Sequence, residues 1–377
     1  MEENPGFFWT VLSFLVVIGP LVFVHELGHY FVGRWFGVKA DAFSIGFGRE
    51  ITGWTDRRGT RWKIGWLPLG GYVKFAGDMG PASQPSKEWL SMPAEERARM
   101  FQGKPVWQRF LIVAAGPVTN FLFAIIIFSG FLLTYGQQQT PPVIAGVVSA
   151  SAAAQAGLRA GDRILSISGK TVDRFEDIAM IVSLRPEQPL RIEAEREGRR
   201  IEVVAVPQTR VERDRFGNEF RKGLLGVTPA GSVIEPVPAT AVVGLAVRQT
   251  VDIVTMSIEG IGQIITGRRS VKELGGPLKI AQYSGQQASL GLEALIWFMA
   301  IISINLGFIN LLPIPLLDGG HLFFYMIEAV RRKPLAPEAQ EWAFRTGIAA
   351  LLTLMIFVTL NDLASFGLWS KLGGLIG

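Results

Sequence analysis

Four long apolar blocks constrain the fold of this chain more than any other feature. They cover residues 7–24 (continuing to about residue 36), 111–135, 294–317 and 346–360, and ordinary polar sequence separates them. A helix needs about 20 apolar residues to cross the hydrocarbon core of a bilayer. We therefore expect a polytopic α-helical membrane protein with about four transmembrane helices, of which the fourth is short for a span.

The distribution of charge predicts the orientation of these helices. Basic residues are dense between the first two blocks, whereas the N-terminal stub carries Glu2 and Glu3. The positive-inside rule makes residues 37–105 a cytoplasmic loop and leaves the N-terminus outside. Four crossings then place residues 136–290 and the C-terminus outside as well. The net charge of +5 therefore indicates no nucleic-acid partner.

Within the outside segment, residues 143–207 have the pattern of a compact α+β domain. We expect strands at 143–148, 164–167, 190–194 and 200–206, a short helix at 151–156 and a longer one at 175–184. The stretch AGLRAGDRILSISGK resembles a PDZ domain, and the alternative is a small β-rich domain with another role. Residues 208–231 are polar, and we expect an irregular hairpin or a linker there. Residues 240–266 have the spacing of an amphipathic helix, which can lie on the membrane surface or pack beside the soluble domain.

The sequence His25-Glu26-Leu27-Gly28-His29 is the strongest chemical signal in the chain. Positions i and i+4 share one face of a helix, so both imidazoles can reach one metal ion. Glu26 lies beside that face, where a carboxylate can take a proton from a water molecule. The chain has no cysteine, so His, Asp or Glu must hold any metal. Ionisable groups inside an apolar span are costly unless paired or liganded, which favours a functional site.

A catalytic zinc site usually needs a third protein ligand. The chain has three histidines, and the third, His321, lies three residues after Asp318 in NLLPIPLLDGGH. On a helix either residue can face the metal, so the spacing leaves both open. The prolines and paired glycines interrupt a spanning helix, which membranes tolerate where the freed backbone lines a cavity.

Together these motifs give the chain a family resemblance. HELGH in the first span and NLLPIPLLDG in the third resemble the site-2 proteases, intramembrane zinc metalloproteases that include the bacterial regulator-of-sigma-E protease. GPVTN at 116–120 and LGGPLKIAQYSGQQA at 274–288 are similar to stretches of the same family. Residues 61–75 resemble its membrane-dipping β segment.

The resemblance implies roles for individual residues. His25, His29 and Asp318 would bind one Zn2+ ion, and Glu26 would be the general base. Asn310 would hold the substrate or stabilise the oxyanion, Asn120 would support the site, and His321 would be structural. These residues are identified by their motifs.

The resemblance also implies substrates and a location. The substrates would be single-span membrane proteins, such as anti-sigma factors already trimmed by another protease, or signal-peptide remnants. The protein would lie in a bacterial inner membrane, with its termini and PDZ-like domain in the periplasm and its active site towards the cytoplasm. A peptide C-terminus is a possible ligand of the PDZ-like groove, and the domain would restrict access.

The 61–75 segment has two interpretations. It can hold an unwound substrate as an added strand, with Trp62, Ile64 and Trp66 facing one way. Alternatively, it is a surface hairpin anchored by its tryptophans.

Two other functions compete with proteolysis: an inactive membrane scaffold that carries a PDZ-like domain, and an ion transporter.

The expected order of segments follows from these observations. The expected segments are a first transmembrane helix in 1–36, a cytoplasmic loop in 37–105, a second helix in 106–136, the PDZ-like domain in 137–210, a linker with an amphipathic helix in 211–290, a third helix in 291–320, a loop in 321–345, and a fourth helix with the C-terminus in 346–377.

Overall fold

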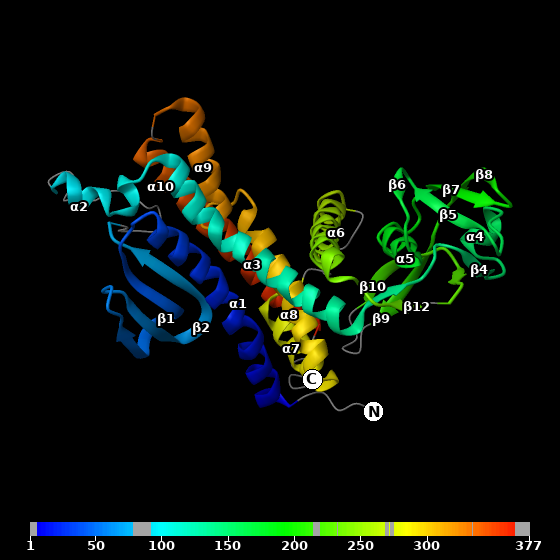
Figure 1. Cartoon of the computed structure of the whole chain (residues 1–377), viewed down its shortest axis with the longest axis horizontal. Coiled ribbons are helices and arrows are strands. Elements are labelled where there is room, and N and C mark those ends of the chain that lie inside the picture. Colours follow the sequence, from blue (N-terminus) through cyan, green and yellow to red (C-terminus); the bar gives the residue numbers. More distant parts are fainter. Residues whose placement is uncertain are drawn as a thin grey trace, which may run out of the picture. The chain divides into compact units, whose positions relative to one another are not determined.

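The computed structural model contains long helices and short β-rich segments (Figure 1). It describes residues 6–77, 92–213, 219–231, 233–267, 271, 275–333 and 335–365. The expectations for the N-terminal stub, for residue 274 and for the C-terminus beyond residue 365 lie outside the described residues. The helices are α1 (Phe7–Trp35), α2 (Ala94–Ala98), the 3-10 helix η2 (Phe101–Gly103), α3 (Val106–Tyr135), α4 (Ala152–Gln155), α5 (Phe175–Ser183), α6 (Ala239–Ile265), α7 (Pro277–Leu290), α8 (Leu292–Leu311), α9 (Asp318–Arg331) and α10 (Pro337–Ser365).

The strands fall into one long pair near the N-terminus and a group of shorter ones in the middle of the chain. They are β1 (Ala40–Thr55), β2 (Arg61–Phe75), β3 (Gln137–Gln139), β4 (Ile144–Val147), β5 (Arg163–Ile167), β6 (Lys170–Thr171), β7 (Leu190–Arg196), β8 (Arg199–Ala205), β9 (Gln208–Arg213), β10 (Glu219–Leu224), β11 (Val227–Pro229) and β12 (Val233–Glu235).

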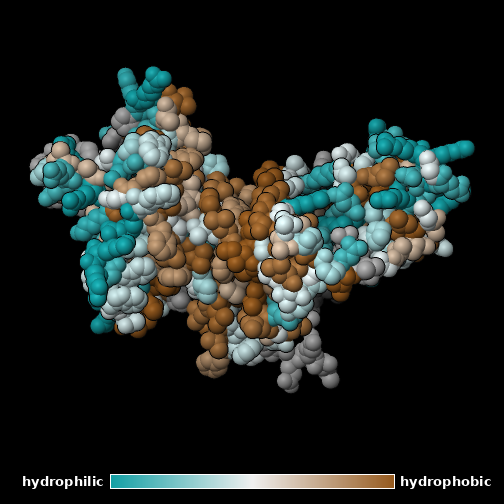
Figure 2. Space-filling model, in the orientation of Figure 1, coloured by the Kyte–Doolittle hydropathy of each residue, from teal (hydrophilic) through white to brown (hydrophobic). Residues whose placement is uncertain are grey.

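Five helices among the described residues are long and apolar enough to cross a membrane, so the chain has the character of a multi-pass membrane protein. They are α1, α3, α6, α8 and, in α10, residues Glu338–Leu363. The sequence predicted about four, and the additional candidate is α6. The last helix is longer than the apolar block suggested, because its polar first turns are also helical and Glu341 pairs with Arg345 one turn later. Hydrophobic residues gather over these helices, and hydrophilic ones over the β-rich segments (Figure 2).

The loop expected at 321–345 is mostly helix. Helix α9 begins at Asp318 and continues to Arg331, so only a short connection separates it from α10. Its buried face includes Leu322, Tyr325 and Glu328. The search for apolar blocks did not reveal this helix because it is amphipathic rather than apolar throughout.

The chain forms two compact units. The first comprises Met1–Phe128, Ala246–Val254 and Gly275–Asp362. In its core, Val17 and Leu21 of α1 are fully buried and cluster with Leu295 of α8. A second cluster joins α1, the β1–β2 pair, η2 and α3 through residues that include Tyr30, Phe43, Phe75, Phe101 and Ile112.

Strands β1 and β2 form an antiparallel pair in which both strands are bent. Phe43 has two partners in the register, Val73 and Trp62. Residues 61–64 lie beside residues 42–45 on one side and beside 52–55 on the other. The pair therefore has the width of four short strands, and 61–64 is an inner one.

This register bears on one of the two interpretations of residues 61–75, the binding of an unwound substrate as an added strand. Ile64 already has Ile45 and Thr52 as partners, so an added strand has no free side to pair with there. In the register of the described residues, each of residues 71–75 has a single partner, within residues 40–45 of β1, which leaves their other side as an edge. Strand pairing between distant residues is not encoded in local apolar spacing, so the sequence did not reveal it.

The second unit contains the β-rich domain. Its strands and helices lie where the sequence predicted them, as β4, α4, β5, α5, β7 and β8. A four-stranded sheet in the order β6-β5-β7-β8 encloses a core with fully buried Ile164, Ile167 and Ile192. The fold continues beyond the expected boundary at residue 210, because Val227 of β11 pairs with Val147 of β4.

A buried ion pair stabilises this domain. The Asp162 side chain is fully buried, and it accepts hydrogen bonds from Arg196 Nε and Nη2, both at 2.7 Å, and from the Arg159 backbone N–H at 2.8 Å. Burial alone would raise the pKa of Asp162, but these hydrogen bonds outweigh it and lower the pKa below its usual value. The AGLRAGD turn thus has a structural role.

Candidate metal centre and active site

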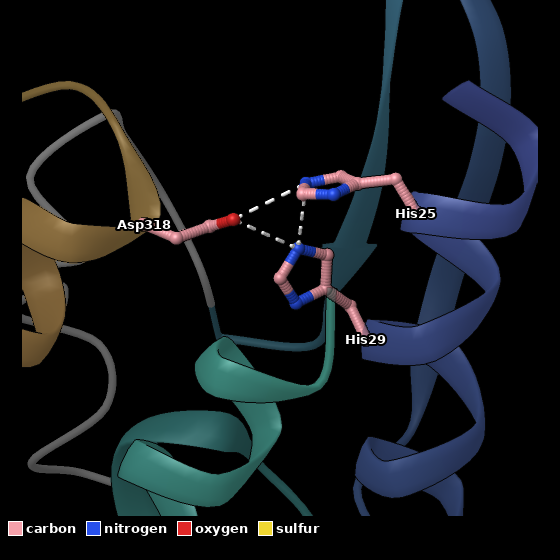
Figure 3. A group of neighbouring side chains, drawn as sticks. All are labelled: His25, His29 and Asp318. Carbon is pink, nitrogen blue, oxygen red and sulfur yellow. Dashed lines mark hydrogen bonds and ion pairs between the residues drawn. The ribbon is translucent and has the colours of Figure 1, made fainter. Parts of the chain in front are cut away.

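His25 and His29 lie on one face of α1 and point to a common centre (Figure 3). Their Nε2 atoms are 3.3 Å apart. Both residues are at most 9% exposed, and so is Glu26 between them. The i, i+4 spacing therefore brings the two imidazoles together, as the sequence predicted.

Asp318 completes the group from the other end of the chain. Its Oδ2 lies 3.2 Å from His25 Nε2 and 3.4 Å from His29 Nε2 (Figure 3). Among the described residues, these three are the ones that could together hold a metal ion. The structure thus brings Asp318, and not His321, to the two imidazoles.

The loop before Asp318 determines where this carboxylate points. Helix α8 ends at Leu311, and the segment with Pro313 and Pro315 leads directly into α9. Leu316 has a φ of 94°, a left-handed conformation that costs a non-glycine residue about 1–3 kcal/mol. Backbone strain of this size persists where the surrounding structure over-determines it, as it does beside functional groups.

The paired glycines after Asp318 allow the loop to close. A Cβ atom on Gly320 would lie 2.5 Å from the Ile314 carbonyl oxygen, and one on Gly319 would overlap the Leu312 carbonyl oxygen. The first turn of α9 thus packs directly on the loop backbone. This close approach explains why glycine follows Asp318 twice.

The donor set fits a metal ion. His29 Nδ1 lies 2.9 Å from the Ile112 carbonyl oxygen, so this nitrogen carries the proton and Nε2 presents its lone pair to the centre. Asp318 Oδ2 is buried without a hydrogen-bond donor. Two imidazole nitrogens and one carboxylate oxygen, all within 4.8 Å of one another, are a ligand set that Zn2+ prefers.

Asn120 contacts the imidazole of His25. Its side-chain amide lies 3.1 Å from His25 Nδ1, while its buried Oδ1 has no hydrogen-bond partner. Rotating the amide by 180° lets Oδ1 accept the His25 Nδ1–H, which satisfies both groups and leaves Nε2 free for a metal. Ser303 donates a hydrogen bond to the Asn120 carbonyl oxygen at 2.8 Å and ties α8 to this part of α3.

The sequence matches a known family along most of its length. The model of peptidase family M50 covers residues 13–354. The chain belongs to peptidase family M50, the site-2 proteases. It is 46% identical over 361 residues to an Agrobacterium fabrum protein named "Putative zinc metalloprotease", covering 94% of this chain and 96% of that one. A Rhizobium meliloti protein of the same name is 46% identical over 360 residues, covering 94% and 96%. Metalloprotease MmpA of Caulobacter vibrioides is 36% identical over 394 residues, covering 98% and 99%.

This family membership agrees with the geometry of the site. The M50 peptidases are zinc metalloproteases of membranes, and the His-His-Asp group of this chain fits their metal. The chain is therefore a zinc metalloprotease that works in a lipid bilayer on membrane proteins.

Glu26 lies against the edge strand of the β1–β2 pair. Its carboxylate accepts a hydrogen bond from the Val73 backbone N–H. A Cβ on Gly71 would lie 3.0 Å from Glu26 Cγ and 2.7 Å from the Ser44 carbonyl oxygen, so glycine allows the strand to approach this carboxylate. The carboxylate of Glu26 therefore lies directly beside an open strand edge.

Asn310 and His321 line the cavity at the site without joining the metal group. The cavity has a volume of about 460 Å³, and its walls include His25, Glu26 and Asp318. The imidazole of His321 packs against the ring of Phe344, with their centres 5.1 Å apart. The roles expected for His321 and Asn310 stay predictions.

Gly116 is a site residue that the sequence analysis did not single out. A Cβ at this position of α3 would overlap His29 Nε2 and lie 2.9 Å from His25 Cε1. Both imidazoles thus pack against the backbone of Gly116, which has no side chain. The GPVTN motif contains this glycine. The sequence alone does not show why a glycine is needed there, because the reason is the contact between α1 and α3.

We expect Gly116→Ala to remove most of the zinc from the purified protein. The added methyl group overlaps both imidazoles, and overpacking of this kind typically costs about 1–3 kcal/mol or displaces the side chains. The measurement is zinc per chain by atomic spectroscopy. Gly130→Ala on the same helix is the control, because its Cβ would meet nothing within 4 Å. A Gly116→Ala protein with the zinc content of the control would contradict the packing argument.

Proposed function

We propose that this M50 peptidase cuts single-span membrane proteins within or beside their spanning segments, with His25, His29 and Asp318 as zinc ligands and Glu26 as general base. The observation that carries the proposal is the convergence of the three metal-binding atoms next to a buried glutamate. The cavity at the site gives a peptide room to reach all four groups.

The chemistry follows from the position of each side chain. Zinc, when bound, polarises the scissile carbonyl and lowers the pKa of water towards neutrality. Glu26 takes the proton of the attacking water and delivers it to the leaving amine. Asn310, on the cavity wall, donates a hydrogen bond to the oxyanion that develops on the peptide carbonyl.

The substrate has to be extended before it can react. A helical substrate uses its carbonyl groups in its own hydrogen bonds, so it must unwind where it is cut. Residues 71–75 offer an unwound substrate an edge with backbone groups to pair with. Because Gly71, Tyr72 and Val73 also line the cavity, a strand added there would lie against Glu26.

Disulfide trapping tests this mode of binding. The chain contains no cysteine, so single cysteines can be introduced without background. We expect Tyr72→Cys in a Glu26→Gln protein to cross-link to a single-span substrate with cysteines near its cleavage site. Cross-links should form at alternate substrate positions, as in a paired strand. The matched control is Ile64→Cys on the inner strand, and equal trapping by both positions would count against binding at this edge.

The proposed location is a bacterial inner membrane, with the active site towards the cytoplasm and the β-rich domain in the periplasm. The basic residues between α1 and α3 support this orientation. It requires that α6 does not cross the bilayer, although α6 is long and apolar enough to do so.

The contacts of α6 support a position in the membrane interface. Glu259 pairs with Lys170 and lies 3.8 Å from Arg185, and Gln263 donates a hydrogen bond to the Leu184 carbonyl oxygen. These partners belong to the β-rich domain, and this domain also leads into the first turn of α6 through β12. The 21 residues from Ala239 to Glu259 span about 30 Å, the thickness of the hydrocarbon core.

A crossing α6 would therefore carry a charged domain through the bilayer. Lying in the interface, it can instead turn its exposed apolar residues to lipid. These residues are Val243, Val247, Val251, Ile258 and Ile265. The protein would then have four spans, with both termini on one side.

Thiol labelling distinguishes the two arrangements of α6. We expect Thr240→Cys and Thr266→Cys, one at each end of α6, to react with a membrane-impermeant maleimide from the same side of the membrane. Glu197→Cys, on the β7–β8 turn, reports the side on which the domain lies. Labelling of the two α6 positions from opposite sides would show that α6 crosses.

The proposed substrates are anti-sigma-factor-like proteins that another protease has already trimmed. The β-rich domain would limit access to such shortened substrates, either by binding a newly exposed C-terminus as PDZ domains do or by excluding bulky outer domains. Supporting this role, the domain has a closed core of its own and is inserted between α3 and α6.

Cleavage by the purified protein tests the proposed function. The wild type should cut a trimmed single-span substrate in detergent, and Glu26→Gln should keep its zinc but cut at least about 100-fold more slowly. Glu341→Gln, an exposed glutamate on α10, is the control. Removing residues 143–229 should let an untrimmed substrate be cut as fast as a trimmed one. Normal cleavage by Glu26→Gln would refute the mechanism, and a wild type that does not cut would favour the scaffold interpretation.

A further inference from the structure

A buried ion pair connects α3 to α9 outside the group of catalytic residues. Arg109 Nη2 lies 3.0 Å from Glu328 Oε2, and the two side chains are 14% and 9% exposed. The Arg109 guanidinium also lies over the ring of Tyr325, 4.9 Å from its centre. Charged groups that are buried to this degree are costly unless they are paired, so the pair has to be explained.

The pair lies on the two helix segments that determine the metal geometry. Arg109 precedes by three residues Ile112, whose carbonyl oxygen accepts the hydrogen bond from His29. Glu328 lies on α9, which begins with Asp318. The first turns of α3 thus hold α1 through a backbone carbonyl and α9 through Arg109.

Asp318 needs such an anchor more than the two histidines do. His25 and His29 share one continuous helix, so their separation is determined by α1 itself. Asp318 follows an interrupted loop in which Leu316 adopts a left-handed conformation. A metal ligand must be held to within about 0.5 Å, so the position of α9, which begins at Asp318, matters as well as the loop.

We propose that Arg109 and Glu328 are positioning residues that hold Asp318 at its distance from His25 and His29 and thereby determine the affinity for zinc. This inference rests on the proposed role of Asp318 as a ligand. Neither residue lines the cavity at the site. Their effect passes along α9, a rigid element that transmits the position of Glu328 to its first residue.

The test is zinc affinity, measured by competition with a chromophoric chelator on the full-length protein in detergent. We expect Arg109→Met and Glu328→Gln to bind zinc about 10–100-fold more weakly than the wild type, the range typical of outer-shell partners of metal ligands. Cleavage at saturating zinc should recover towards the wild-type rate. Arg345→Met removes an exposed pair on α10 and is the matched control.

The outcomes separate this inference from the proposed function. If Asp318→Asn loses zinc while folded Arg109→Met and Glu328→Gln keep the affinity of the control, the positioning role is wrong and the ligand assignment stands. If Asp318→Asn binds zinc as the wild type does, the ligand assignment fails. Circular dichroism of the zinc-free proteins reports folding, and unfolding of both pair variants would make the pair structural and overturn the inference.

Discussion

Burial of two imidazoles and a carboxylate at one point of an apolar bundle is the constraint on which the rest of the structure depends. Such groups are costly in a low-dielectric interior unless a cation balances them and every remaining polar atom has a partner. The surroundings provide such partners: the Ile112 carbonyl oxygen lies beside Nδ1 of His29, and the Asn120 side chain lies beside Nδ1 of His25. The orphaned oxygen of Asp318 points to the same centre, where the zinc of an M50 peptidase belongs.

Close approach of the elements is the second requirement of this arrangement. Gly116 lets α3 touch the imidazoles, and Gly71 lets the edge strand touch Glu26. Helices α1, α3, α8 and α9 and the bent strand pair thus meet at a single cavity, where the His-His-Asp group, Glu26 and the strand edge are all within reach of one peptide. The proposed chemistry and the proposed unwinding of the substrate therefore use the same small space.

The sequence predicted the features that depend on local pattern. HELGH predicted that His25 and His29 share one helix face because helical periodicity is local, and turn glycines such as Gly157 and Gly198 bounded the elements of the β-rich domain. Spacing alone left Asp318 and His321 open, and only the family resemblance favoured Asp318, because the direction of each side chain depends on the broken loop and on the packing of Phe344. Bending of the β1–β2 pair and the closing strand β11 were missed, since long-range pairing decides them. Helix α6 was predicted, but as an amphipathic helix and not as a candidate span.

The central claim is that Asp318, and not His321, completes the metal site with His25 and His29. Zinc content after extensive dialysis of purified wild type, Asp318→Asn and His321→Ala tests it most directly. The account predicts about one zinc per chain in the wild type and in His321→Ala, and almost none in Asp318→Asn. Zinc retained by Asp318→Asn and lost from His321→Ala would contradict it.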